Sequence, residues 1–131
     1  MNAKVKEYAN SHKVLTLQIT RNNFVEIMQG RQKVEHRYIY PSNANKYIAE
    51  MENEDEDPKP RHYDALYLIN GRRQNAPRML VEVKDAEFVI CIDDEGNDIT
   101  FVEDGVEYYE CQVWYHLGAV LDVENIKIEN K

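Results

Sequence analysis

Phe24–Arg37, FVEIMQGRQKVEHR, is the stretch of sequence that decides the fold. Its first half has apolar residues at helical spacing and predicts a helix over residues 23–29, capped by Asn22 or Asn23. Gly30 follows where a helix end needs a residue that tolerates a positive φ. After Gly30 the pattern changes to a period of two, which predicts a strand.

That strand is expected over Lys33–Tyr40 and carries charges of both signs on one face. Lys33, Glu35 and Arg37 share this face because successive side chains of a strand point to opposite sides. A row of three charged residues is unusual for a protein core. The face therefore either is open to solvent or lines a polar cleft.

The length of 131 residues predicts one domain, which can build a core without disulfides or metals. We expect residues 1–13 to be an N-terminal extension, a frayed start that can include some helix, and residues 14–131 to be the single domain. The sequence shows no secretory signal and no apolar stretch long enough to span a bilayer. It therefore predicts a cytoplasmic protein without a membrane partner, in which Cys91 and Cys111 are reduced, half-buried thiols.

Charge is segregated along the chain, although the net charge is −8. Residues 1–49 carry a formal charge of +5, residues 50–57 carry −6, residues 58–84 carry +4 and residues 85–131 carry −11. An acidic protein does not bind duplex DNA through its overall field. A local basic cluster still allows a nucleotide or a short single strand of RNA as a partner.

The first half of the chain predicts one more strand and one more helix. Leu15, Leu17 and Ile19 alternate with polar residues, so residues 14–20 are expected to form a half-buried strand. A second helix is expected after its cap Ser42, with Tyr47, Ile48 and Met51 as the apolar stripe. Two prolines end it, and the acidic residues 52–61 are expected to form a mobile surface loop.

The second half is expected to be mostly strand. Residues 62–71 are apolar on both faces, and residues 79–92 predict one long strand or two strands joined at a bulge near Lys84-Asp85. The sequence EDG at 103–105 predicts a hairpin turn, and GAVLDVENIKI at 118–128 predicts a closing strand. The expected fold class is α+β, mainly β, as a small β-barrel with two or three short helices.

Standard catalytic motifs are missing from the sequence. It contains no phosphate-binding glycine loop, no H-E-x-x-H and no C-x-x-C pair. The four histidines, His12, His36, His62 and His116, lack the spacing of metal ligands. The sequence therefore predicts neither a metal site nor a cofactor.

The segment GRQKVEHR nevertheless resembles the signature of the ASCH domain family, in which a helix ending in I-x-x-G precedes G-x-K-x-x-E-x-R. Gly30, Glu35 and Arg37 match this pattern. The strand before it, the segment YDALYLING and the closing WYHLGAVLDV fit the family's order, so the resemblance covers about residues 14–123. It implies a PUA-like β-barrel that binds RNA or nucleotides.

One departure concerns the family's small amidohydrolases, which act on acylated cytidine. Their catalytic lysine stands where this chain has Gln32, and Glu35 stands where they have a threonine. Lys33 follows one residue later and could replace the lysine if the strand register shifted by one residue. The candidates for catalytic groups are therefore Lys33 and Glu35.

The predicted ligand-binding residues are Gln32, Lys33, Glu35 and Arg37. An arginine offers a planar donor fork to phosphate, and a glutamate accepts from the exocyclic amine of cytosine. Aromatic residues that could stack on a base, or that could equally be core residues, are Tyr38, Tyr40, Tyr67 and Trp114.

Three functional hypotheses follow from the sequence. The first is a binding module for RNA, a nucleotide or a modified nucleoside. The second is an enzyme that uses the same cleft, either a nucleoside amidohydrolase or a ribonuclease. The third is a protein-interaction domain without catalytic activity, which the acidic second half favours.

Overall fold

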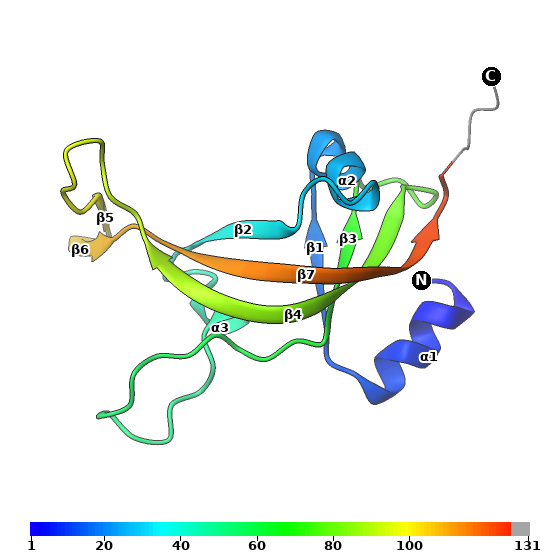
Figure 1. The fold of residues 1–131 in the computed structure, drawn as a ribbon. Coiled ribbons are helices and arrows are strands. Elements are labelled where there is room, and N and C mark those ends of the chain that lie inside the picture. The colour runs from blue at the N-terminus through cyan, green and yellow to red at the C-terminus, as the bar shows by residue number, and fades with distance from the viewer. Residues whose placement is uncertain (127–131) are drawn as a thin grey trace. The chain divides into compact units, whose positions relative to one another are not determined.

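The computed structural model describes residues 1–126 and is mainly β, as the sequence predicts. Its described part contains three helices and seven strands (Figure 1). In chain order these are α1 (Ala3–Ser11), β1 (Val14–Gln18), α2 (Arg21–Met28), β2 (Val34–Ile39), α3 (Ala44–Tyr47), β3 (Ala65–Ile69), β4 (Arg78–Ile90), β5 (Thr100–Glu103), β6 (Val106–Tyr109) and β7 (Cys111–Glu124). Residues 127 and 128 of the expected closing strand lie outside the described residues.

The strands form a five-stranded sheet in the order β1-β3-β4-β7-β2 and a separate two-stranded sheet, β5-β6. β1 and β7, which lie in the predicted first and closing strands, belong to the same sheet. The predicted barrel is wrong, because β1 and β2 are the two ends of the sheet and do not pair with each other. Alternation of side chains indicates the buried face of a strand, but it does not indicate which strand each edge meets.

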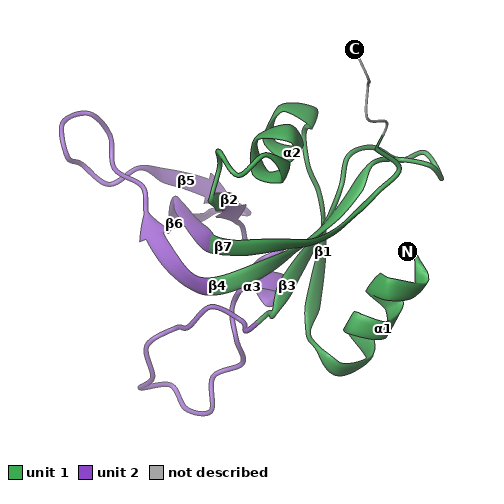
Figure 2. Cartoon of the chain, turned by 45° about the vertical axis from the view of Figure 1, so that its right-hand side comes forward, with its two compact units in different colours: residues 1–34, 63–84, 116–131 green, residues 35–62, 85–115 purple. Residues whose placement is uncertain are grey.

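The chain forms two compact units, each built from segments that are distant in sequence (Figure 2). Unit 1 contains residues 1–34, 63–84 and 116–131, and unit 2 contains residues 35–62 and 85–115. The boundary at residue 84 falls inside β4, at the position where the sequence suggested a bulge. β4 is nevertheless one continuous strand. The single domain over residues 14–131 stays a prediction.

Unit 1 has its core around β3, which is buried on both faces as its apolar sequence predicts. β3 pairs in parallel with β1 and antiparallel with β4, so that Leu66 lies opposite Leu15 on one side and Val81 on the other. Helix α1 adds the fully buried Val5 to a cluster with Tyr67 and Leu80. Residues 3–11 are therefore an ordered helix rather than a frayed start.

Two expected helix caps are replaced by neighbouring residues. Thr20 caps α2, since its side chain accepts a hydrogen bond from the Asn23 backbone, whereas the sequence pointed to Asn22 or Asn23. Gly30 has φ of 76°, as expected for a residue after a helix end. The helix predicted after Ser42 is a single turn, because Ile48 already bridges Pro60. Its N-cap is Asn43, whose side chain accepts from the Tyr40 backbone N–H and does not cap the helix.

Unit 2 contains the hairpin β5-β6, and its turn confirms the EDG signal. Asp104 and Gly105 both have positive φ, the geometry of a tight hairpin turn. Met51, expected on the buried stripe of the second helix, is 45% exposed. It belongs to the long acidic segment between α3 and β3 (Figure 1). The mobility of residues 52–61 stays a prediction.

Candidate functional site

The segment GRQKVEHR is divided between the two units. Gly30, Gln32 and Lys33 belong to unit 1, whereas Glu35 and Arg37 belong to unit 2. The predicted site residues therefore form two groups, one in each unit.

Gln32 and Lys33 line a polar pocket of about 350 Å³ in unit 1. The backbone holds both residues in place: the Gln32 amide N–H donates to Glu26 O at 3.0 Å, and Leu117 N–H donates to Lys33 O at 2.8 Å. The Gln32 side-chain amide donates to Val34 O at 2.9 Å, which leaves its carbonyl oxygen available as an acceptor. The full lining is Ile27, Met28, Gly30, Gln32, Lys33, Glu82, Lys84, Leu117, Gly118, Ala119 and Val120.

Glu82 and Lys84 contribute the other two charged side chains of the polar pocket. Both project from β4 on the same face, and both are exposed. Val81, which precedes Glu82 in β4, is buried. Neither Glu82 nor Lys84 was predicted as a site residue from the sequence. Their signal was present in LVEVK, where two charged residues follow the buried residues 79–81 at alternate positions.

Gly118 gives the carboxylate of Glu82 the space it occupies. A Cβ atom built on Gly118 would overlap Glu82 Oε1 and would lie 3.0 Å from Lys84 Cγ. β7 therefore carries its only glycine directly beneath the two charged side chains of β4. The missing side chain at position 118 keeps this wall of the polar pocket charged rather than apolar.

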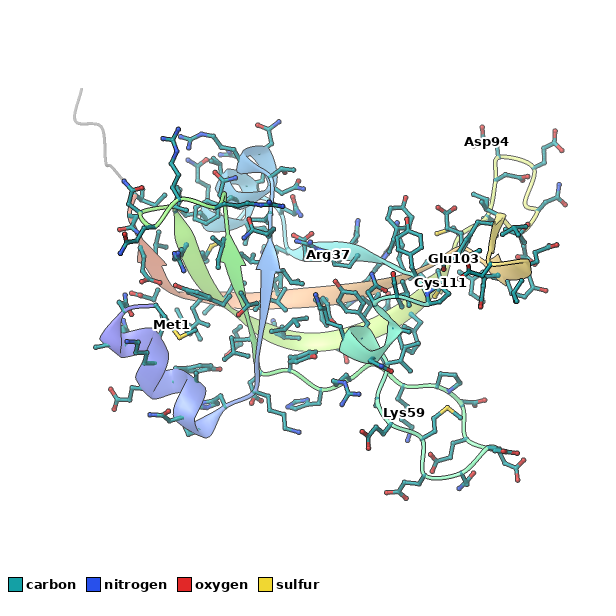
Figure 3. The ribbon with its side chains drawn as sticks, turned by 180° about the vertical axis from the view of Figure 1, so that it is seen from behind. Met1, Arg37, Lys59, Asp94, Glu103 and Cys111 are labelled. Atoms are coloured by element: carbon teal, nitrogen blue, oxygen red, sulfur yellow. The ribbon has the colours of Figure 1, made fainter. Side chains whose placement is uncertain are left out.

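Glu35 and Arg37 form an ion pair in unit 2, where Arg37 lies on β2 (Figure 3). Arg37 Nε lies 3.3 Å from Glu35 Oε1, and Glu35 is only 4% exposed. Its second oxygen, Oε2, is buried and accepts no hydrogen bond within residues 1–126. Burial raises the pKa of the Glu35 carboxyl, and the charge of Arg37 opposes this rise.

The charged face of β2 is therefore turned inward, and of the two outcomes allowed by the sequence, exposure to solvent is excluded for Glu35. The expected pairing of Glu35 with Arg37 is present. Neither residue lines the polar pocket of unit 1. Whether either one contacts a ligand stays a prediction.

The four aromatic residues proposed as stacking surfaces have different environments. Tyr67 is 1% exposed and belongs to the core of unit 1, where burial and a hydrogen bond to Glu124 raise its pKa to about 12. It cannot stack on a base. Trp114 packs against His36 with ring centroids 4.4 Å apart. Tyr38 and Tyr40 are 45% and 41% exposed and stay available for contact.

Cysteine and metal chemistry find little support in the described residues. Cys91 and Cys111 are free and partly buried, and burial raises the pKa of both thiols. Raised values disfavour the reactive thiolate. Within residues 1–126, no group of three or more His, Cys, Asp or Glu side chains could hold a metal ion. No helix in the same residues is both long and apolar enough to cross a membrane.

The two units differ in charge. The described residues of unit 1 carry ten Lys/Arg and six Asp/Glu, a formal charge of +4. Unit 2 carries four Lys/Arg and seventeen Asp/Glu, a formal charge of −13. The polar pocket therefore lies in the basic unit, where the local field favours an anionic ligand.

Comparison of the chain with protein-family models, with curated proteins and with solved structures finds no match.

Proposed function

We propose that the chain is an ASCH-like module that binds a nucleotide, a modified nucleoside or the exposed end of single-stranded RNA in the polar pocket of unit 1. The observation that carries this proposal is the presence of two lysines, Lys33 and Lys84, in one pocket of a unit with a formal charge of +4. The volume of about 350 Å³ is at the lower end of the range for small-molecule pockets. It suits one nucleoside rather than a folded RNA.

Each polar side chain of the pocket has a defined role in this proposal. The ammonium groups of Lys33 and Lys84 attract phosphate. The Glu82 carboxylate accepts from an exocyclic base amine, as from cytosine N4. Gln32, whose amide N–H is already bonded, presents its carbonyl oxygen to a donor on the ligand.

The test is binding of cytidine monophosphate, followed by calorimetry, and of labelled oligouridylate, followed by anisotropy. Lys33→Gln/Lys84→Gln should weaken RNA binding and lower the slope of log affinity against log salt by about 0.7 for each lost phosphate contact. Lys6→Gln is the matched control, because Lys6 is an exposed lysine of α1 that does not line the pocket. Equal losses in the double variant and the control would mean that the pocket is not the binding site.

A second candidate function is hydrolysis of an acylated nucleoside, and one observation favours it. Lys33 and Glu82 line the same pocket, which places an amine and a carboxylate where they could share acid and base roles. Water would add to the amide carbonyl, the C–N bond would break, and the leaving amine would take up a proton. Glu35, the other catalytic candidate, is buried in unit 2 and does not line this pocket.

An assay of the purified protein against N4-acetylcytidine decides this second candidate. Turnover that is lost in both Lys33→Ala and Glu82→Gln would assign hydrolysis to the polar pocket. Absence of turnover, with cytidine monophosphate still bound, would leave the binding function alone. Cleavage of the labelled oligouridylate in the same assay would instead indicate the ribonuclease alternative.

A further inference from the structure

Unit 2 contains an apolar pocket that the proposed nucleotide function does not use. Its volume is about 490 Å³, and its lining is almost entirely apolar or aromatic. The rings form a connected wall: the centroids of Tyr40 and Phe101 are 5.6 Å apart in an edge-on arrangement, and those of Phe101 and Tyr108 are 5.5 Å apart and stacked. This wall is therefore already assembled without a ligand.

Several lining side chains of the apolar pocket are left open to solvent. Ile90 is 57% exposed and Tyr109 is 62% exposed, although both are large apolar residues at strand positions. All four residues of β6 are exposed, and within residues 1–126 β6 pairs only with β5. An exposed apolar surface beside an open strand edge is typical of an interaction site.

The charges on the side of this pocket that residues 85–115 form are all negative, whereas Lys59 adjoins the lining residue Pro58 on the other side. Residues 85–115, which supply β5, β6 and half of the pocket lining, carry ten Asp/Glu and no Lys or Arg. Glu87 precedes the lining residue Phe88, and Glu107 and Glu110 flank the lining pair Tyr108-Tyr109. The occupant must therefore bring positive charge next to its apolar part.

Glu103 adds an independent observation. It lies two residues after Phe101 on β5 and so shares the face of the strand that lines the pocket. Its Oε2 atom is buried and has no hydrogen-bond partner within residues 1–126. A buried carboxylate oxygen without a donor is costly, and a cationic group of a ligand would supply the donor once the Glu103 side chain turned toward it.

We infer that unit 2 is a docking site for a basic peptide segment, in which an apolar or aromatic side chain fills the apolar pocket and flanking Lys or Arg residues meet the surrounding carboxylates. A peptide fits better than a small cation because the acidic residues come from several elements. Glu87 lies on β4, Glu103 on β5 and Glu107 on β6. An extended chain rises by about 3.3 Å per residue, so a peptide can place several positive charges along its length. A small cation carries its charge at one point and could not meet carboxylates on three strands. This inference is independent of the nucleotide site in unit 1.

The test uses the full chain and three fluorescein-labelled peptides, KKLFKK, KKSSKK and EELFEE, followed by anisotropy. We expect KKLFKK to bind at least about tenfold more tightly than either of the others, since only it offers both the apolar anchor and the positive charge. Equal affinity of KKLFKK and KKSSKK would overturn the inference, because it would show attraction to charge without use of the pocket.

Two pairs of variants assign the binding to the pocket. Ile90→Ser should weaken KKLFKK about tenfold, and Ile92→Ser, which alters a similarly exposed isoleucine outside the lining, should not. Glu103→Gln should also weaken KKLFKK, whereas Asp94→Asn, at the tip of the loop between β4 and β5 (Figure 3), should not. Both exposed isoleucines and Asp94 contribute little packing, so the proteins should remain folded.

Other occupants of the apolar pocket would give different results. Self-association that Ile90→Ser abolishes, together with no binding of KKLFKK, would assign the pocket to a second copy of the chain and overturn the inference. Binding of a neutral apolar dye that KKLFKK does not displace would assign it to a small apolar ligand, with the same consequence.

Discussion

At the scale of single residues, Glu35 is the exception in the core, since it is the only polar or charged residue among those buried from solvent in residues 1–126. Its pKa is raised above the usual value of 4.5, because burial disfavours the carboxylate. A raised pKa means that the folded protein binds this proton more tightly than the unfolded chain does. Stability from this group is therefore fully present below about pH 4.5 and is lost as the pH rises through the folded pKa.

We expect Glu35→Gln to become more stable relative to the unsubstituted protein as the pH rises from about 4 to about 7, because glutamine does not titrate. The measurement is the free energy of unfolding in urea at each pH. Glu26→Gln is a control with the opposite sign, since the hydrogen bond to Arg31 lowers the pKa of the exposed Glu26. That variant should become less stable relative to the unsubstituted protein over the same range. If the relative stability of both variants changed in the same direction with pH, the Glu35 carboxyl would not be the source of the pH dependence.

Arg37 distinguishes a structural ion pair from a ligand contact. Because Arg37 lies 3.3 Å from the buried Glu35, we expect Arg37→Ala to lower the free energy of unfolding by about 1–3 kcal/mol at pH 7. Binding of cytidine monophosphate should stay unchanged, since Arg37 does not line the polar pocket. Weaker binding at unchanged melting temperature would instead support the ligand contact that the ASCH resemblance implies.

Gly118 tests whether the charged wall of the polar pocket matters for binding. In Gly118→Ala the new methyl group would overlap Glu82 Oε1, so the carboxylate and the neighbouring Lys84 must move. Because the carboxylate is the flexible end of an exposed side chain, stability should change by less than about 1 kcal/mol. Cytidine monophosphate should bind more weakly, as measured by calorimetry. If Gly118→Ala binds the nucleotide as well as the unsubstituted protein, Glu82 does not position the ligand.

At the scale of the elements, the strands could be predicted well and the helix ends poorly. β1 and β3 lie where alternating or doubly apolar sequences placed them, because burial on a sheet face follows directly from side-chain periodicity. The bounds of α1 could not be predicted within a start expected to be frayed with some helix, since its sequence is polar around a single buried residue, Val5. α3 ends at Tyr47 because Ile48 is extended and pairs with Pro60 instead of continuing the helix.

The cap of α2 offers a direct test at this scale. Thr20 Oγ1 accepts from the Asn23 backbone N–H at 3.4 Å, a long bond, so Thr20→Ala should cost about 0.5–1 kcal/mol of stability. Asn22→Ala is the matched control, because the sequence pointed to Asn22 as a cap and the structure places it inside the helix. Alanine favours helix interiors, so this control should leave stability unchanged or slightly raised. A larger loss in Asn22→Ala than in Thr20→Ala would contradict the observed cap.

At the scale of the whole molecule, the candidate site could be predicted only in part. Gln32 and Lys33 follow one another in the sequence and were found from the motif. Glu82, Lys84 and Gly118 join them through the pairing of distant strands, which no local pattern reveals. The separation of charge has the same origin. Runs of basic and acidic residues are visible in the sequence. Their assignment to units with formal charges of +4 and −13 depends on which segments of the chain fold together in each unit.

The course of the chain also predicts how the protein unfolds. The chain passes between the two units four times, after residues 34, 62, 84 and 115, and β4 and β7 each continue from one unit into the other. Neither unit is a continuous segment that could fold by itself while the other remains unstructured. We therefore expect one cooperative transition for the whole chain, in agreement with the predicted single domain.

Trp114 makes this expectation measurable, because it is the only tryptophan of the chain and lies in unit 2. Leu66→Ala, in the fully buried β3 of unit 1, should lower stability by about 2–5 kcal/mol through the cavity it leaves. If the units unfold together, this change in unit 1 lowers the urea midpoint of Trp114 fluorescence as much as that of far-UV circular dichroism. A fluorescence midpoint that stays in place while the dichroism signal acquires an earlier step would mean that unit 2 unfolds on its own, and that the chain consists of two domains formed from interleaved segments.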